Sequence, residues 1–147
     1  MPRTQAPRAT TADLGFLLAK ASAHWNELLV RAFAARGFGD VRPAYGSILL
    51  PLFEEDGQRI GDLGRRARLP KQTMTTLVRQ MERDGLVARE ADAEDGRAFR
   101  IHLTRRAREF RPVAAEVLGD LHARAAEHLT RAIAATLEQG LRDVLEL

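Results

Sequence analysis

Polar side chains recur at helical spacing in the segment Leu69–Gly85 and have the chemistry needed to read duplex DNA. Written as a helix, the segment gathers them on one face with no carboxylate among them. Amide and hydroxyl groups suit base edges in a major groove, and guanidinium groups suit phosphate or guanine. This stripe consists of Gln72, Thr76, Arg79 and Arg83. The wider set expected to contact DNA on this helix is Lys71, Gln72, Thr73, Thr75, Thr76, Arg79 and Arg83.

An apolar face on the other side would seat this helix, predicted over about residues 70–84, on a core. Its members are Met74, Leu77, Val78 and Met81, which recur at three- and four-residue steps. A helix lying in solvent would show the same pattern, so the stripe alone does not decide between a DNA groove and water. The neighbouring elements favour the groove.

A short helix and a tight turn precede this recognition helix. Gly61–Ala67 has room for about two turns of helix, with Leu63 and Ala67 at buried spacing. Arg68-Leu69-Pro70 then turns the chain. Two helices joined by so short a turn form a helix-turn-helix.

A hairpin is predicted directly after the recognition helix, which Gly85 is placed to end as a left-handed cap. Leu86–Glu90 and Ala98–Leu103 read as strands, since the second alternates apolar and polar side chains. Asp95-Gly96 is a strong turn pair, which makes the two strands a hairpin wing over about residues 86–103.

Arg97 falls at the tip of this wing, where its guanidinium could enter a minor groove of DNA. The nearby carboxylates of Asp92 and Asp95 are expected to shape the turn and to pair with Arg97.

The run from Ile60 to Thr104, IGDLGRRARLPKQTMTTLVRQMERDGLVAREADAEDGRAFRIHLT, resembles the DNA-binding lobe of the MarR family of bacterial transcription regulators. The specific features are the hydrophobic pattern of the recognition helix, the DGLV that follows it, and a D-x-x-D-x-R wing before a strand ending in Leu103-Thr104. The resemblance implies a mainly α fold with a small β-hairpin wing. Residues 44–104 would form the winged helix-turn-helix lobe, and residues 12–36 and 105–147 a helical dimerisation lobe.

The resemblance also implies how such a protein would act. Members of the family bind pseudo-palindromic operators in double-stranded DNA as homodimers, and many release DNA when a small aromatic effector binds between the lobes. A DNA-binding transcriptional regulator is therefore the expected function, with a repressor favoured over an activator. The alternative is a winged-helix protein-interaction module that has lost DNA reading, which would be expected to carry exposed apolar or acidic side chains on the recognition stripe.

Three positions depart from the family pattern. Pro70 stands where a capping serine or threonine is common, and it offers no side-chain oxygen to the helix start. Gly96 stands where the wing often carries another basic residue. Pro51 lies inside the expected second helix, Ala44–Phe53, and removes the backbone hydrogen bond to the carbonyl of Ser47.

Charge is distributed unevenly along the 147 residues. The formal net charge is +3, but residues 59–111 hold 14 basic and 8 acidic side chains, a net +6, whereas the remainder holds 9 and 12, a net −3. The positive field therefore coincides with the expected DNA-binding lobe. No stretch is apolar enough to span a membrane and the N-terminus does not look like a signal, so a cytoplasmic protein is expected.

Both flanks of this lobe carry apolar stripes on expected helices. The first helix, from about residue 13 to 36, would be closed by Gly37 and follow a loose arm at 1–11. Its stripe is Leu14, Leu17, Leu18, Ala21, Trp25, Leu28, Leu29 and Ala32. The C-terminal stripe is Leu118, Leu121, Ala125, Leu129, Ile133, Leu137, Leu141 and Val144. One small lobe does not need so much apolar surface for its own core, so a homodimer is expected, with packing inside one chain as the alternative.

The C-terminal flank is expected to divide into two helices. A long helix would start at Arg105 and kink near Pro112. A shorter helix would start after Thr136, because Thr136-Leu137-Glu138-Gln139 has the form of a capping box.

Catalytic and metal sites find little support in the sequence. No two histidines stand four residues apart, no glycine-rich phosphate loop follows a strand, and cysteine is absent, which excludes thiol chemistry and disulfides. The acidic run Glu54-Glu55-Asp56 precedes Gly57 and reads as a solvated turn. We therefore expect no enzyme, no cofactor and no metal.

An effector pocket, if one exists, is placed by the resemblance between the first helix, the second helix and the start of the long helix. The residues there able to stack on or hydrogen-bond a small aromatic anion are Phe16, His24, Trp25 and Tyr45. Ordinary core or dimer packing is the alternative role for each of them.

Overall fold

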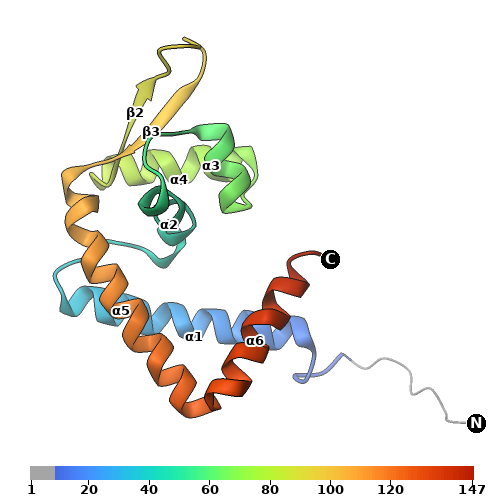
Figure 1. The fold of residues 1–147 in the computed structure, drawn as a ribbon. Coiled ribbons are helices and arrows are strands. Elements are labelled where there is room, and N and C mark those ends of the chain that lie inside the picture. Colours follow the sequence, from blue (N-terminus) through green and yellow to red (C-terminus); the bar gives the residue numbers. More distant parts are fainter. Residues whose placement is uncertain (1–8) are drawn as a thin grey trace, which may run out of the picture.

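The structure, a computed structural model, describes residues 9–147 and forms a helical lobe and a winged helix-turn-helix lobe (Figure 1). Most of the expected N-terminal arm, residues 1–8, lies outside the described residues. The helices are α1 (Leu14–Ala35), the 3-10 turn η1 (Pro43–Tyr45), α2 (Gly46–Glu54), α3 (Ile60–Ala67), α4 (Lys71–Arg83), α5 (Arg105–Leu129) and α6 (Arg131–Val144). The strands are β1 (Gln58–Arg59), β2 (Val87–Ala91) and β3 (Phe99–Leu103). The expected fold class is confirmed.

The first helix begins and ends where the sequence predicts. Asp13 caps α1, since its carboxylate accepts a hydrogen bond from the Phe16 N–H at 3.0 Å. Gly37 follows the helix with a φ of +83°, a conformation that glycine adopts without steric cost. Only the inward face of α1 near its C-terminal half is buried, at Leu29 and Phe33.

The helix-turn-helix is built as expected, with boundaries that differ by one residue. Leu63 of α3 and three side chains of α4, Met74, Val78 and Met81, are buried in one core. Arg68 makes the sharp turn between the two helices in a left-handed conformation, with a φ of +52°. Exposed polar residues occupy the other side of α4, so the amphipathic pattern is confirmed.

The wing is a three-stranded antiparallel sheet in the order β1-β3-β2 rather than a hairpin alone. Strands β2 and β3 pair in the expected hairpin, with Val87 opposite Leu103 and Ala91 opposite Phe99. The additional strand, β1, has two residues and was not predicted, since so short a segment carries no alternation of its own. It adds Gln58 opposite Ile101 at the base of the wing.

The expected boundary between the last two helices is wrong. Helix α5 passes through Pro112 and ends at Leu129, and α6 begins at Arg131, six positions earlier than the capping-box pattern suggested. Thr130 is the actual N-cap, at a φ of +67°, and accepts from the Ile133 N–H. Thr136 instead lies inside α6, where its hydroxyl donates to the carbonyl of Ala132 one turn back.

Helix α2 likewise contains Pro51 without ending there, because a short helix loses only one backbone hydrogen bond to it. The 3-10 turn η1 precedes α2, so the α-helix begins at Gly46 instead of the expected Ala44. Within residues 9–147, no helix is both long and apolar enough to cross a membrane.

Candidate nucleic-acid interface

Helix α4 presents a polar face to solvent and an apolar face to the core. The exposed side chains on α4 include Lys71, Gln72, Thr73, Thr76, Arg79 and Arg83, and Thr75 is half-buried. The predicted contact set on this helix is therefore accessible. Pro70 provides no side-chain cap, so no side chain occupies the free N–H groups of the first turn, which point toward any anion docked there.

Two of the three threonine hydroxyls on α4, those of Thr75 and Thr76, have a fixed orientation. The hydroxyl of Thr76 donates to the carbonyl of Gln72 at 3.0 Å, and that of Thr75 donates to the carbonyl of Lys71 at 3.0 Å. Because each hydroxyl hydrogen is used within the helix, the outward lone pairs are acceptors. Such an oxygen suits the exocyclic amino group of adenine or cytosine in the major groove.

The cations of the predicted interface are not neutralised by carboxylates. Most other arginines of this lobe form ion pairs, such as Arg65 with Asp62 and Arg66 with Glu54. In the described part of the chain, by contrast, no ion pair involves the four basic residues of the recognition helix and the wing tip. These are Lys71, Arg79, Arg83 and Arg97. Their charge is available to phosphate.

The wing projects from the lobe beyond α3 and α4, away from α1 and α6 (Figure 1). Arg97 is exposed at its tip, and its backbone N–H donates to the Asp95 carboxylate at 3.0 Å. The expectation that Asp95 shapes the turn is therefore met through the backbone of Arg97, not through its guanidinium.

Asp92 has a different partner from the one expected. It is buried and pairs with the Arg59 Nε at 2.5 Å and the Arg100 Nε at 3.5 Å, so it does not pair with Arg97. The pKa of Asp92 is lowered, chiefly because the Glu94 N–H donates to the carboxylate, and the two guanidinium groups act in the same direction. The sequence could not reveal this pairing because β1, which brings Arg59 to the wing, was not predicted.

The C-terminal end of α4 is held by two residues from other segments, Tyr45 of η1 and Arg106 of α5. The Tyr45 hydroxyl donates to the Asp84 carboxylate at 2.6 Å, and Arg106 donates to the Asp84 carbonyl at 3.3 Å. Arg106 also bonds the Asp40 carboxylate at 2.5 Å, which lowers the pKa of Asp40. Burial, and then the hydrogen bond to Asp84, raises the pKa of Tyr45 to about 12.

A cavity of about 170 Å³ lies where the effector pocket was expected, between α1, α2 and α5. Apolar and aromatic side chains line most of it, including Trp25, Phe53 and Phe110. Arg42 is the one charged residue among its lining side chains. Sequence reasoning did not identify Arg42, because it lies in a loop with no periodic pattern.

Only one of the four residues predicted for this pocket lines it. Tyr45 is fully buried beneath the cavity, with its hydroxyl turned to Asp84. Phe16 lies on the exposed N-terminal half of α1, with the ammonium of Lys20 5.5 Å from its ring. His24 faces solvent beside Glu27. The four side chains are not brought together, because α1 directs Trp25 inward and the other two α1 residues outward.

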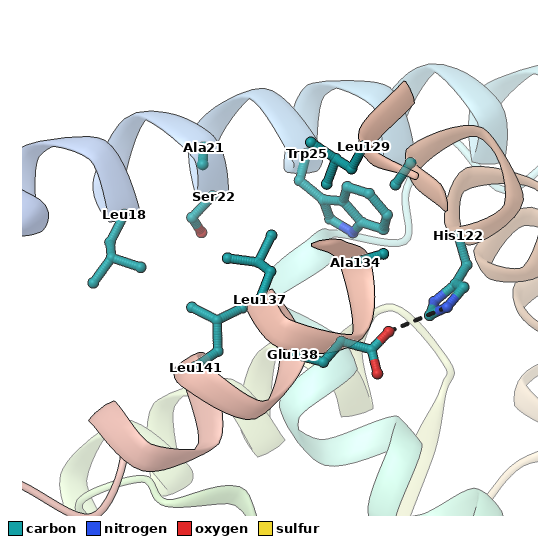
Figure 2. A pocket seen from close by; sticks show the side chains of 11 residues that line it. Leu18, Ala21, Ser22, Trp25, His122, Leu129, Ala134, Leu137, Glu138 and Leu141 are labelled. Atoms are coloured by element: carbon teal, nitrogen blue, oxygen red, sulfur yellow. Dashed lines mark ion pairs between the residues drawn. The ribbon is translucent and has the colours of Figure 1, made fainter. Parts of the chain in front are cut away.

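A second, larger cleft of about 570 Å³ separates α1 from α6 (Figure 2). Figure 2 shows Leu137 and Leu141 of α6 pointing toward α1, while Trp25 closes one end. Its walls are almost entirely apolar, and the polar pair His122 and Glu138, at 3.2 Å, lies at the edge. Other large apolar side chains of α1 and α6 are also exposed, including Leu14, Leu17 and Ile133.

Within residues 9–147, the acidic and histidine residues do not gather into a group of three that could hold a metal ion. Glu54 and Glu55 instead pair with Arg66, and His102 contacts Glu90 at 3.3 Å. The acidic run is therefore a surface turn, with Asp56 accepting from the Leu103 N–H at 2.8 Å.

Comparison with known proteins identifies relatives of this interface. Residues 40–98 match the model of the MarR family. The chain is 32% identical over 98 residues to the HTH-type transcriptional repressor YetL of Bacillus subtilis (strain 168), covering 65% of this chain and 57% of that protein. The match thus spans less than two thirds of the repressor.

Solved structures share the fold over nearly the whole chain. The transcriptional regulator PcaV of Streptomyces coelicolor, in complex with its natural ligand, aligns with a TM-score of 0.80 at 18% identity, over 96% of this chain and 97% of that one. The transcriptional repressor CouR, bound to a 23-mer DNA duplex, aligns with a TM-score of 0.78 at 21% identity, over 95% and 99%. At these identities the likeness establishes the fold alone.

Proposed function

Because residues 40–98 match the MarR family model and the chain is similar to an HTH-type transcriptional repressor, we propose that it is a transcriptional repressor that binds a pseudo-palindromic operator as a homodimer. The observation that carries the proposal is the free charge on one exposed surface. Lys71, Arg79, Arg83 and Arg97 lack ion pairs within residues 9–147, although most arginines around them are neutralised. Unpaired cations on one surface repel one another unless a ligand of opposite charge neutralises them.

Helix α4 and the wing have separate roles in this proposal. Gln72 and Thr76 near the start of α4 read base edges in the major groove, while Arg97 follows the backbone or a minor groove. Similarity to CouR, which is bound to a DNA duplex, and to YetL, which is named a repressor, supports DNA binding and repression in general.

Selection of genomic DNA fragments by the purified protein tests the proposal. We expect one enriched motif with two-fold symmetry and half-sites about one helical turn, or ~10 bp, apart. Gln72→Ala protein should lose the motif while still retaining DNA non-specifically. Recovery of no motif, together with retention of proteins by the same surface, would favour a protein-interaction module instead.

The homodimer is supported by the apolar cleft between α1 and α6. Exposed leucines and isoleucine on both helices would face water in an isolated chain, and patches of this kind mark association surfaces. A second copy can cover them through a two-fold interface, in which α1 and α6 of each protomer contact the other. Sedimentation should give a dimer, and Leu137→Glu, at the exposed wall of the cleft, should give a monomer with weakened operator binding.

The cavity between α1, α2 and α5 is proposed to bind a small aromatic acid. Its volume of about 170 Å³ is enough for one ring, since an apolar cavity of ~150 Å³ can hold benzene. Aromatic walls favour a ring, and Arg42 provides a cation for a carboxylate.

Trp25, the only tryptophan of the chain, lines this cavity and also closes one end of the cleft between α1 and α6, so variants of Arg42, which lines the cavity and not the cleft, are needed to assign a change in its fluorescence. Salicylate should quench its fluorescence and weaken operator binding along one titration curve, since linkage requires one coupling free energy for both effects. Arg42→Met should shift both curves to higher salicylate concentration, whereas Arg42→Lys should shift them less. Quenching that leaves operator affinity unchanged would contradict the effector role.

A further inference from the structure

Tyr45 lies between the cavity and the recognition helix. Its backbone is part of η1. The cavity between α1, α2 and α5 is lined by Pro43 of η1 and by the residues on either side of this turn, Arg42 and Gly46. Its side chain is fully buried, and its hydroxyl donates to the Asp84 carboxylate at 2.6 Å. Tyr45 is therefore linked through the backbone to Gly46 in the cavity wall, and through its hydroxyl to the end of α4.

Asp84 is the residue at which α4 ends. Its N–H donates to the carbonyl of Gln80 at 3.0 Å, in the last turn of the helix. A displacement of the Asp84 carboxylate should therefore shift the last turn of α4 through the backbone. The half-buried Asp84 has no other side-chain partner within residues 9–147 than the hydroxyl of Tyr45.

A second contact joins the same helix end to the cavity. Arg106 donates to the Asp84 carbonyl, and its guanidinium lies 5.7 Å from the ring centre of Phe38. Phe38 packs against Phe110 with ring centres 5.1 Å apart, and Phe110 lines the cavity. Two independent chains of contact thus run from the cavity wall to Asp84.

The hydrogen bond of Tyr45 has few alternatives. A buried phenol that loses its acceptor cannot turn to water, and a bond to a carboxylate is stronger than one between neutral groups. Burial and the Asp84 carboxylate keep the phenol protonated, as its raised pKa records. The contact should therefore remain formed unless η1 or α4 moves.

We propose that Tyr45 is a positioning residue that couples the cavity between α1, α2 and α5 to the placement of the recognition helix on DNA. A ligand that displaces η1 would pull Asp84 through this bond and reorient α4. Docking of α4 on its operator would in turn alter the cavity, because coupling between two sites is reciprocal. The inference rests on the proposed DNA binding by α4, but not on the identity of any effector.

The reciprocal effect can be measured without a ligand. The operator recovered by fragment selection is titrated into the protein while the emission of Trp25 is recorded, with excitation where tyrosine does not absorb. Wild-type protein, Tyr45→Phe, Asp84→Ala and the double variant are compared. Thr136→Val is the matched control, because it removes a hydroxyl of α6 that bonds only the carbonyl of Ala132.

Operator should change the Trp25 emission of wild-type and Thr136→Val protein. Tyr45→Phe and Asp84→Ala should each reduce this change without abolishing it, because the contact through Arg106, Phe38 and Phe110 remains. Both variants should bind operator more weakly, on the order of tenfold, with random duplex affected by less than about twofold. The double variant should be no worse than either single variant, since both remove the same contact. Thermal unfolding of each variant separates this effect from a general loss of stability.

Two results would overturn the inference. One is a wild-type Trp25 emission that does not respond to operator. The other is that Tyr45→Phe protein shows the same Trp25 emission change and the same preference for operator as the wild type. Asp84→Ala protein is used for this comparison if Tyr45→Phe protein does not fold. Absence of any operator preference in the wild type would instead refute the proposed function.

Discussion

The unpaired cations of the interface predict the salt dependence of DNA binding. Lys71, Arg79, Arg83 and Arg97 give four free cations per chain and eight per homodimer. If each meets a phosphate, the logarithm of the association constant should fall with the logarithm of salt concentration at a slope of roughly −7. Affinity for the operator should then decrease about 10⁴-fold between ~50 and ~200 mM salt.

Arg97→Ala removes one of these cations from each protomer. The slope should become less steep by about 1.8 in a homodimer, but only by about 0.9 if a single chain binds. Because Arg97 is exposed and pairs with no carboxylate in the described residues, the substitution should leave the folded state unchanged. Any change in the slope therefore reports a lost DNA contact.

Fluorescence anisotropy of labelled operator and of scrambled duplex, at several salt concentrations, measures both slopes. Arg31→Ala is the matched control, since Arg31 is also exposed and belongs to α1, a helix that Figure 1 shows apart from α4 and the wing. A wild-type slope shallower than about −3, or an equal change for Arg31→Ala and Arg97→Ala, would refute the reasoning from unpaired charge.

Three further predictions address single contacts. Gln72→Ala should weaken operator binding by about 1–3 kcal/mol and random duplex binding little, in the same anisotropy assay; equal losses on both would exclude base reading. Tyr45, the only tyrosine, should ionise near pH 12 when followed by ultraviolet absorbance. The free energy of unfolding should fall as pH rises from about 10 to 12, because the pKa of Tyr45 is raised in the folded state. Ionisation near pH 10 in the folded protein would contradict the buried contact of Tyr45. Asp92, whose pKa is lowered in the folded protein, should stabilise the wing at pH values above its ordinary pKa of 3.8 and lose this effect as pH falls through the lower folded-state pKa. Amide hydrogen exchange of β2 and β3 measures this stability. Unchanged exchange in Asp92→Asn at neutral pH would be inconsistent with the ion pairs of Asp92 to Arg59 and Arg100.

The sequence was a good guide wherever local periodicity decides structure. The recognition helix, its exposed stripe and the wing hairpin are confirmed, because their apolar and polar residues alternate at the period of the element itself. The start of α6 was predicted wrongly because that prediction also relied on a local pattern. A capping-box pattern is also compatible with a helix interior, and Thr130, the real cap, has no distinctive pattern around it.

By itself, then, the sequence determined the winged helix-turn-helix and the cations on its surface, since these depend on spacing within continuous segments. Only the tertiary structure decided which distant side chains meet. In the folded chain Arg59 pairs with Asp92, the Tyr45 hydroxyl donates to Asp84, and Arg42 lines the cavity. These contacts join residues far apart in the chain, and their geometry is fixed by packing between elements, which no local pattern encodes.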